Sequence, residues 1–396
     1  MVRVLHTSDW HVGKAIRGNS RADEHRAVLA EIAGIVGERA VDVVVVAGDL
    51  FETAAPTPEA EEIVYRALLD LAGTGATVVV VSGNHDNPSR LRAVAPLLEL
   101  GRVHLVTEPR RPADGGVRRI EAASGEALSV ALLPFVSQRG VVRAEALMAD
   151  AAFQHAQAYA DRMRLLIDVL AGGFDPGLPT MLVAHGFVAG STAGGGERAG
   201  HLVEEYAIPA QAFPATAGYV ALGHLHRAQK LPGATAIHYC GSPLQLDFGE
   251  TTEPKQVNVV DLSVGKPAKV TPVELRAGSR LVTLHGTLDA VVGAAEGLDP
   301  TSWLRVRLDE AQRSGLADEV RSRLGELGPR VVDVAVVGSP TARAGQTGRV
   351  RRDGRTPREL FAEFLASRDV ADPRLLPLFD ELHEAVAGAE VEGVGG

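Results

Sequence analysis

The stretch of sequence that decides the fold is Val-Val-Val-Val-Ala-Gly-Asp-Leu-Phe, at residues 43–51. Its four consecutive valines predict a short buried strand. Gly48 and Asp49 follow the valines, so an acidic side chain is expected at the carboxyl end of this strand. Comparable apolar runs occupy residues 2–5, 78–81 and 182–184. The sequence therefore predicts several buried strands spread over its first half.

Longer segments between these runs show helical spacing of apolar residues. Helices are expected over residues 22–37, 58–73 and 144–170, and another helix is expected to begin near Pro88. Thr57 and Pro58 supply an N-cap and a first helical residue for the second of them. Further strands are expected to begin at Met181, Tyr219, Ala236 and Val257. The alternation of strands and helices predicts one layered α/β domain over residues 1–270.

The character of the sequence changes after residue 261. Gly265, Pro267 and Pro272 are typical of a linker. The segment beyond it predicts a small α+β cap domain over residues 276–338. Its expected elements are strands at residues 280–286, 303–308 and 331–337 and a helix at residues 316–327.

The last part of the sequence predicts a tether and a helical tail. Residues 339–355 are rich in Gly, Ala, Thr and Arg and have no apolar period, which predicts a flexible linker. Residues 356–396 show two short amphipathic patterns. A linker of this length favours docking of the tail on another protein. The candidate partner-binding side chains are Leu360, Phe361, Phe364, Leu375, Leu378, Phe379 and Leu382.

The composition narrows the class of protein. The chain has 396 residues, 45% hydrophobic and 23% charged, as in a globular protein of two or three domains. Its formal net charge of −10 argues against a protein that coats nucleic acid by positive charge alone. Aromatic residues, at 4%, are too scarce for base stacking to be the main binding device. Neither a targeting segment nor a membrane-length apolar run is seen, so a cytoplasmic location is expected.

Five short clusters carry the residues suited to catalysis, each just after an expected strand. They are Ser8-Asp9-Trp10-His11, Gly48-Asp49-Leu50-Phe51, Gly83-Asn84-His85-Asp86, His185-Gly186 and Gly223-His224-Leu225-His226. In α/β folds, ligand-binding and catalytic sites lie at the carboxyl ends of the strands. The single cysteine, Cys240, excludes a thiolate-rich zinc site, so any metal must be held by oxygen and imidazole nitrogen. Such donors suit Mn²⁺, Fe²⁺ or Zn²⁺.

The spacing within the clusters favours two metal ions. Asp9 and His11 are two residues apart, as are His224 and His226, so in extended chain the members of each pair point the same way. Asp49, on the short loop after the second strand, is the natural bridging carboxylate. Two cations about 3.5–4 Å apart can polarise a phosphodiester and supply hydroxide from water. The clusters therefore predict hydrolysis of a phosphate ester.

In this order the five clusters resemble the calcineurin-type metallophosphoesterase family. The resemblance implies a layered β-sandwich flanked by helices, here with the small α+β cap and C-terminal helices. Residues 5–14, residues 46–51 and Gly241-Ser242-Pro243 resemble a narrower group, the nuclease subunits of double-strand-break repair complexes.

The resemblance also implies a role for each residue of the clusters. One metal is then held by Asp9, His11, Asp49 and His226. The second is then held by Asp49, Asn84, His185 and His224. His85 matches a histidine that contacts the scissile phosphate and protonates the leaving oxygen, and we expect Asp86 to orient it. The chain departs from archaeal and eukaryotic members at Glu52, where they have histidine.

For the whole protein, the resemblance implies a nuclease with two divalent ions, most readily Mn²⁺. It implies 3′→5′ exonuclease action on duplex ends and endonuclease action on single strands and hairpins, within a complex with an SMC-type coiled-coil ATPase. A homodimer within a heterotetramer is expected. Two alternatives remain open at this point: a small-molecule phosphodiesterase or phosphomonoesterase of the same fold, and a non-catalytic assembly subunit.

Overall fold

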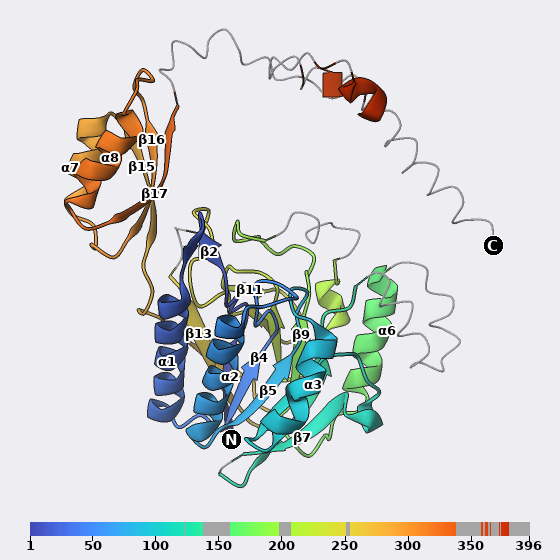
Figure 1. Ribbon diagram of the computed structural model, residues 1–396. Coiled ribbons are helices and arrows are strands. Elements are labelled where there is room, and N and C mark those ends of the chain that lie inside the picture. The colour runs from blue at the N-terminus through green and yellow to red at the C-terminus, as the bar shows by residue number, and fades with distance from the viewer. Residues whose placement is uncertain are drawn as a thin grey trace. The chain divides into compact units, whose positions relative to one another are not determined.

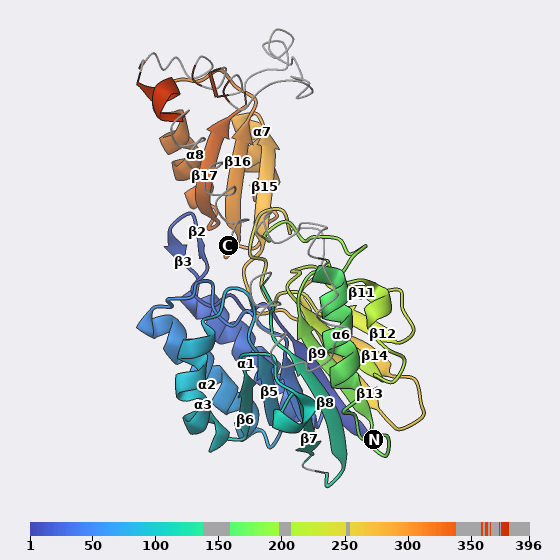
Figure 2. The ribbon, with the colours of Figure 1, turned by 90° about the vertical axis from the view of Figure 1, so that its right-hand side faces the viewer.

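The computed structural model describes residues 1–122, 124–137, 159–197, 207–250 and 254–337, together with residues 358, 361, 362, 365, 372 and 374–379. Residues 1–337 form one compact unit, and residues 338–396 belong to a second. In the first unit two six-stranded sheets pack face to face, and helices cover their outer faces (Figure 1, Figure 2). This is the helix-flanked sandwich that the family resemblance implies.

The first sheet has the strand order β14-β13-β1-β4-β5-β6. In that order the strands are Lys269–Glu274, Gln256–Leu262, Val2–Thr7, Val43–Val46, Thr77–Val81 and Val103–Val106. The last four are parallel, and β13 and β14 are antiparallel to their neighbours. Alternate valines of β4 face opposite ways: Val44 and Val46 pack under the helices, whereas Val43 and Val45 face the second sheet. A strand buried on both faces explains the unbroken valine run.

The second sheet has the order β11-β12-β10-β9-β8-β7. In that order the strands are Gln229–Leu231, Ala236–Tyr239, Tyr219–Gly223, Thr180–His185, Ala127–Leu133 and Val117–Glu121. The four central strands are parallel, and the two edge strands are antiparallel. The sequence pattern did not predict β6, β7 or β8. The core between the sheets is fully buried, with Val4 and Val81 of one sheet against Leu132 and Val183 of the other.

Helices α1 (Ala22–Glu38), α2 (Pro58–Gly73) and α3 (Pro88–Glu99) cover the first sheet, and α6 (Tyr159–Ala171) covers the second. Thr57 caps α2, because its side-chain oxygen accepts a 3.2 Å hydrogen bond from the backbone N–H of Ala60. The positions expected for α1, α2 and α3 are confirmed. Of the helix expected at residues 144–170, residues 144–158 lie outside the described residues.

A smaller layer follows the sandwich. Three parallel strands, β15 (Leu281–Gly286), β16 (Trp303–Leu308) and β17 (Arg330–Val336), carry α7 (Leu288–Ala295) and α8 (Leu316–Gly325) on one face. The sequence pattern missed α7. At the start of β15 and β16 the other face meets the sandwich, where Leu281 and Trp303 pack with Ile16 and Phe248. The indole N–H of Trp303 also donates a 2.8 Å hydrogen bond to Glu24 of α1.

The linker expected around residues 265–272 is wrong. Residues 269–274 instead form β14, an edge strand paired with β13. Pro272 is tolerated there because an edge strand has one side without ladder hydrogen bonds. The turn before it, at Gly265 with φ +68°, closes a hairpin.

The second unit is described at a few helical positions. There the rings of Phe361 and Phe379 stack with centroids 4.4 Å apart, and Leu365 is buried. Leu378 is half exposed. Of the other candidate partner-binding residues, Leu375 is described. Leu360, Phe364 and Leu382 lie outside the described residues. The linker expected at residues 339–355 also lies outside them. In the part of the chain that the structure describes, no helix is both long and apolar enough to cross a bilayer.

Candidate metal centre

The candidate ligands lie at the carboxyl ends of parallel strands from both sheets. The first sheet supplies Asp9, His11, Asp49, Asn84 and His85, and the second supplies His185, His224 and His226. The two sheets pack with these ends together, so the structure brings all eight side chains into one cluster.

Asp49 lies in the middle of this cluster. Its Oδ2 atom is 3.5 Å from Nε2 of His11 and 3.5 Å from Nε2 of His185. Its Oδ1 atom accepts a 2.8 Å hydrogen bond from the backbone N–H of His85. One carboxylate oxygen thus faces a nitrogen donor on each side. This is the position from which a carboxylate can bridge two cations.

The first group of candidate ligands consists of Asp9, His11 and His226. Their potential ligand atoms all lie within 4.8 Å of one another. The Nε2 atoms of the two histidines are only 3.1 Å apart. The carboxylate of Asp9 accepts hydrogen bonds from the backbone N–H of His224, at 2.9 Å, and from the hydroxyl of Ser8, at 2.5 Å. These contacts hold the acid against the second sheet.

The second group consists of Asn84, His185 and His224. The side-chain oxygen of Asn84 is 2.8 Å from Nε2 of His185 and 2.8 Å from Nδ1 of His224. The other ring nitrogen of His185, Nδ1, lies 2.7 Å from the carbonyl oxygen of Ala47. The ring of Phe135 stacks on His224 with an interplanar angle of 14°. The three donors therefore lie close together, with an aromatic ring packed against one of them.

Two glycines permit this close packing. A β-carbon at Gly83 would lie 2.1 Å from Oδ1 of Asp49, and one at Gly223 would lie 1.9 Å from the carbonyl oxygen of Ala47. Neither position can accept a side chain without displacing backbone or the central carboxylate. Here the backbone of one sheet packs directly against the backbone of the other, with no side chain between them.

The donor set fits divalent cations. Two imidazole nitrogens 3.1 Å apart repel each other unless a proton or a cation lies between them. Burial lowers the pKa of His11 to about 4, which keeps its ring in the neutral form that binds metals. Burial also raises the pKa of Asp9 to about 6. For Asp49 burial acts the same way, but the neighbouring histidines, His185 foremost, outweigh it and hold its pKa below the usual value.

The backbone at the cluster is strained. Asp9, His11, Asp49 and His224 have φ angles of 53°, 47°, 52° and 111°. Left-handed backbone is uncommon for residues other than glycine, although Asp and His adopt it more readily than most. Such conformations persist where the surrounding structure imposes them, and they gather at functional sites.

The expected role of Asp86 is wrong. Nδ1 of His85 lies 2.6 Å from the carbonyl oxygen of Glu52, so that carbonyl orients the ring. The buried carboxylate of Asp86 instead accepts hydrogen bonds from the backbone N–H groups of Leu50, Phe51 and Gly83. Asp86 therefore ties the loop after β4 to the loop after β5, which positions both loops but leaves His85 to another partner.

Sequence reasoning missed two carboxylates behind the cluster. Oε2 of Glu52 is 2.9 Å from Nδ1 of His11, and Oε1 of Glu250 is 2.9 Å from Nδ1 of His226. Glu52 adjoins one of the five clusters, which gave a weak signal of its position. Glu250 lies 24 residues beyond its histidine, and no motif marks it.

Two further residues noted in the sequence have structural roles. His6 is fully buried, with Nδ1 3.0 Å from the hydroxyl of Tyr219 and Nε2 3.1 Å from the carbonyl oxygen of Leu222. Cys240 is buried with its sulfur 3.1 Å from the hydroxyl of Ser8, and burial raises the pKa of its thiol. The hydrogen bonds of both side chains go to residues other than the candidate ligands.

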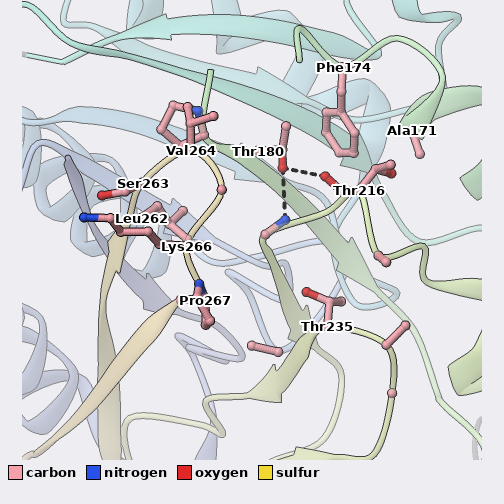
Figure 3. A pocket seen from close by; sticks show the side chains of 18 of the residues that line it. Ala171, Phe174, Thr180, Thr216, Thr235, Leu262, Ser263, Val264, Lys266 and Pro267 are labelled. Carbon is pink, nitrogen blue, oxygen red and sulfur yellow. Dashed lines mark hydrogen bonds between the residues drawn. The ribbon is translucent and has the colours of Figure 1, made fainter. Parts of the chain in front are cut away.

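A large cavity lies at the opposite end of the sandwich from these ligands, where β9 begins (Figure 3). It measures about 1070 Å³ and is lined by the start of β9 and the hairpin after β13. Thr180 donates a hydrogen bond of 2.6 Å to the carbonyl oxygen of Thr216 there. Among the described lining residues only Lys230 and Lys266 are charged, so the cavity offers no cluster of metal ligands.

Known proteins share this sequence over most of its length. Residues 2–227 match the family model described as calcineurin-like phosphoesterase. The chain is 34% identical to the SbcD subunit of the nuclease SbcCD from Bacillus subtilis (strain 168), over 81% of this chain and 83% of that one. It is 31% identical to the same subunit of Rhodobacter capsulatus, over 91% and 94%. It is 30% identical to that of Escherichia coli (strain K12), over 78% and 78%.

The chain therefore belongs to the calcineurin-like phosphoesterase family. The family resemblance predicted from the five clusters is confirmed, and with it the class of reaction, hydrolysis of phosphodiesters with divalent metal ions. Within the family, its relatives over most of the chain are SbcD subunits of the SbcCD nuclease.

Proposed function

We propose that the chain is the nuclease subunit of an SbcCD-type complex and cleaves DNA phosphodiester bonds at a two-metal centre. The position of Asp49 carries this proposal, because one of its oxygens is 3.5 Å from an imidazole nitrogen of each ligand group. The three SbcD relatives, which are named as nuclease subunits, support a nucleic acid as the substrate class, and we propose DNA. A full ligand set argues against the non-catalytic alternative.

In this proposal Asp9, His11 and His226 would hold one ion, Asn84, His185 and His224 would hold the other, and Asp49 would contribute to both. Divalent ions there supply charge neutralisation of the phosphate and a hydroxide nucleophile at neutral pH. Mn²⁺ is the ion we propose, since oxygen and imidazole donors suit it.

His85 is the proposed proton donor to the leaving oxygen. Its Nδ1–H donates to the carbonyl oxygen of Glu52 at 2.6 Å, which fixes the ring and leaves Nε2 to carry and release the proton. The ring centroid of His85 is 4.6 Å from that of His11, so the proton is held beside the first ligand group. The side chain is 9% exposed, which limits competing exchange with solvent.

Arginines on the small β15–β17 layer support a role in guiding DNA. Arg305 and Arg307 lie on adjacent same-face positions of β16, and Arg17 of the sandwich reaches the same face through a 3.2 Å ion pair with Asp333. Arg307 pairs with Asp333 as well, at 2.9 Å. Such a local basic cluster can bind phosphate although the whole chain is acidic.

An exposed apolar patch supports the proposed homodimer. Leu69 of α2 is 42% exposed, and Leu97 and Leu100 at the end of α3 are 69% and 85% exposed. A β-carbon at Gly101 would lie 2.8 Å from Leu69, so Leu69 adjoins the chain just after α3. Replacing Leu97 and Leu100 by Glu should convert a dimer to a monomer, as measured by light scattering after size exclusion.

The proposed partner is the SbcC-type ATPase, bound in the cytoplasm through the helical tail. Deleting residues 356–396 should leave metal binding unchanged and abolish co-purification with the ATPase. Co-purification of the truncated chain would contradict the assignment of the tail. The stacked Phe361 and Phe379 show that part of its apolar surface packs within the tail itself, so the more exposed Leu378 is the better single-site probe.

The decisive experiment incubates the chain and its ATPase partner with Mn²⁺ and end-labelled linear duplex or hairpin DNA. We expect 3′→5′ shortening of the duplex and opening of the hairpin, both lost on chelation by EDTA. Intact DNA after this treatment would overturn the nuclease assignment. Hydrolysis of bis-p-nitrophenyl phosphate with no cleavage of DNA would favour the small-molecule phosphodiesterase alternative.

A further inference from the structure

Two glutamates stand directly behind the imidazoles of the first ligand group. Oε2 of Glu52 is 2.9 Å from Nδ1 of His11, and Oε1 of Glu250 is 2.9 Å from Nδ1 of His226. The two glutamates come from different parts of the chain, one after β4 and one beyond β12, yet each meets its histidine in the same way.

Each glutamate also carries a lysine on its second oxygen. Lys14 lies 2.9 Å from Oε1 of Glu52, and Lys255 lies 2.7 Å from Oε2 of Glu250. Lys255 donates further to the carbonyl oxygen of His226, at 3.0 Å. Each carboxylate is therefore held in place by a lysine. The two glutamates differ in burial, since the side chain of Glu250 is 2% exposed and that of Glu52 is 20% exposed.

An anionic acceptor on Nδ1 decides which ring nitrogen carries the proton. With the hydrogen on Nδ1, the lone pair is on Nε2, which is the atom of each ring turned toward the first ligand group. The Nε2 atoms of His11 and His226 face each other at 3.1 Å, so the carboxylates hold two donors together in spite of their mutual repulsion.

In the part of the chain that the structure describes, His185 of the second ligand group has a different kind of support. Nδ1 of His185 faces the neutral carbonyl oxygen of Ala47 at 2.7 Å. Nδ1 of His224 points into the cluster, at 2.8 Å from Asn84. The first group thus has two charged supports, whereas His185 is supported by a main-chain dipole.

Glu250 is itself held by the loop between β12 and β13, which also contacts β15. Its Oε2 accepts a 3.0 Å hydrogen bond from the backbone N–H of Leu246. The neighbouring Gln245 accepts a 2.8 Å hydrogen bond from the backbone N–H of Leu281, the first residue of β15. The carboxylate behind His226 is therefore anchored on structure outside the metal cluster.

We propose that Glu52 and Glu250 are positioning residues that make the first metal position the tighter of the two. They act through the tautomer and orientation of His11 and His226 and do not touch the metal. This inference rests on the ligand assignment of the proposed function. Outer partners of this kind change metal affinity by about 10–100-fold when removed.

The test is a Mn²⁺ titration of the full-length apo chain, followed by the electron paramagnetic resonance signal of free Mn²⁺. The wild type should bind two ions in a tight and a weak step. His226→Asn should remove the tight step, and Asn84→Ala should remove the weak one. Glu52→Gln and Glu250→Gln should each weaken the tight step about 10-fold or more and leave the weak step unchanged.

A spectroscopic readout separates positioning from general destabilisation. In long-range ¹H–¹⁵N spectra of the apo wild type, His11 and His226 should show the Nδ1–H tautomer, and each glutamate variant should lose this signature for its own histidine. Glu61→Gln is the matched control, since Glu61 forms a 2.7 Å ion pair with Arg90 at the surface and not with a proposed ligand. Glu52→Gln also guards against misfolding, because Glu52 is the more exposed of the two.

An unchanged tight step in both glutamate variants would overturn this inference, and so would weakening of the other step instead. A wild type that binds no Mn²⁺ would remove the ligand assignment itself, which is a failure of the proposed function. The two failures are thus distinguished by the wild-type titration alone.

Discussion

The two sheets of the sandwich contribute different chemistry to the same cluster. The first sheet supplies both acids and the amide, Asp9, Asp49 and Asn84, whereas the second supplies imidazoles alone, His185, His224 and His226. Neither sheet has a complete set for even one cation. The centre is therefore made by tertiary packing, so its integrity depends on how the sheets meet as well as on the ligands.

The largest expected effect comes from the residue shared by both groups. Asp49→Asn removes the bridging charge, and we expect no measurable DNA hydrolysis, since metal charge stabilisation is worth several kcal/mol. Rates with Mn²⁺ and duplex DNA measure the effect. Asp23→Asn, at a fully exposed position, is the control and should retain full activity. Substantial activity of Asp49→Asn would mean that the sheets do not share a ligand.

The next effect separates chemistry from assembly. His85→Gln should lower the cleavage rate by about 10²–10⁴-fold, because it removes a general acid. Its Mn²⁺ stoichiometry should stay that of the wild type, since the proposed ligands are untouched. Loss of bound metal in this variant would contradict the assignment of His85 as a non-ligand.

A third change acts on the contact between the sheets. In Gly223→Ala the new β-carbon would lie 1.9 Å from the carbonyl oxygen of Ala47, so the sheet edges must separate. We expect a loss of about 1–3 kcal/mol in the free energy of unfolding, as for other overpacked cores, together with weakened Mn²⁺ binding. Urea denaturation measures the first and a Mn²⁺ titration the second.

Gly34→Ala provides the contrasting control for that experiment. A β-carbon there meets nothing within 4 Å, and the residue lies in α1, so alanine should stabilise the chain by up to about 1 kcal/mol. Equal effects of the two substitutions would show that the sheet contact at Gly223 is not tight.

The smallest effect is a pH dependence of stability at the sheet interface. His6 of β1 contacts Tyr219 and Leu222 of β10, and burial lowers its pKa to about 3. Below about pH 6.5 the unfolded chain binds a proton at His6 and the folded chain does not. Its contribution is therefore complete above that pH and is lost as the pH falls toward 3, at about 1.4 kcal/mol per pH unit.

His6→Gln should flatten this slope, because glutamine does not titrate. The free energy of unfolding at about pH 5.5 and about pH 7.5 measures it. His285→Gln, at an exposed position, should keep the wild-type slope. Matching slopes for the two variants would show that His6 does not remain neutral between the sheets.

The sequence predicted the parts of the fold that depend on local pattern. The valine run of β4 and the Thr57–Pro58 start of α2 are such cases, since burial on both faces and N-capping leave local traces. Pro272 misled because proline marks linkers and edge strands alike. The short helix α7 was missed, although its N-cap Thr287 accepts a 3.3 Å hydrogen bond from the backbone N–H of Ala290.

For the candidate centre, the five clusters identified side chains that the structure brings together, because each cluster follows a strand at a short spacing. Their supports could not be located in this way. Glu250 contacts His226 only because of the path of the chain between them, which no motif reveals. His85 contacts the backbone carbonyl oxygen of Glu52, and every residue type has such a carbonyl, so the sequence gives no sign of it. Asp86 stood beside His85 in sequence and yet bonds to other loops.

The left-handed backbone at Asp9, His11, Asp49 and His224 restricts how this centre can vary over evolution. A change from Asp to Glu keeps the charge but places a longer residue in a conformation it adopts less readily than Asp does. Each position is therefore constrained twice, by the donor atom and by the main chain. Glutamate is therefore disfavoured at the two aspartate positions. An alanine substitution at any of the four positions removes the donor atom and also places alanine in a backbone conformation that it seldom adopts.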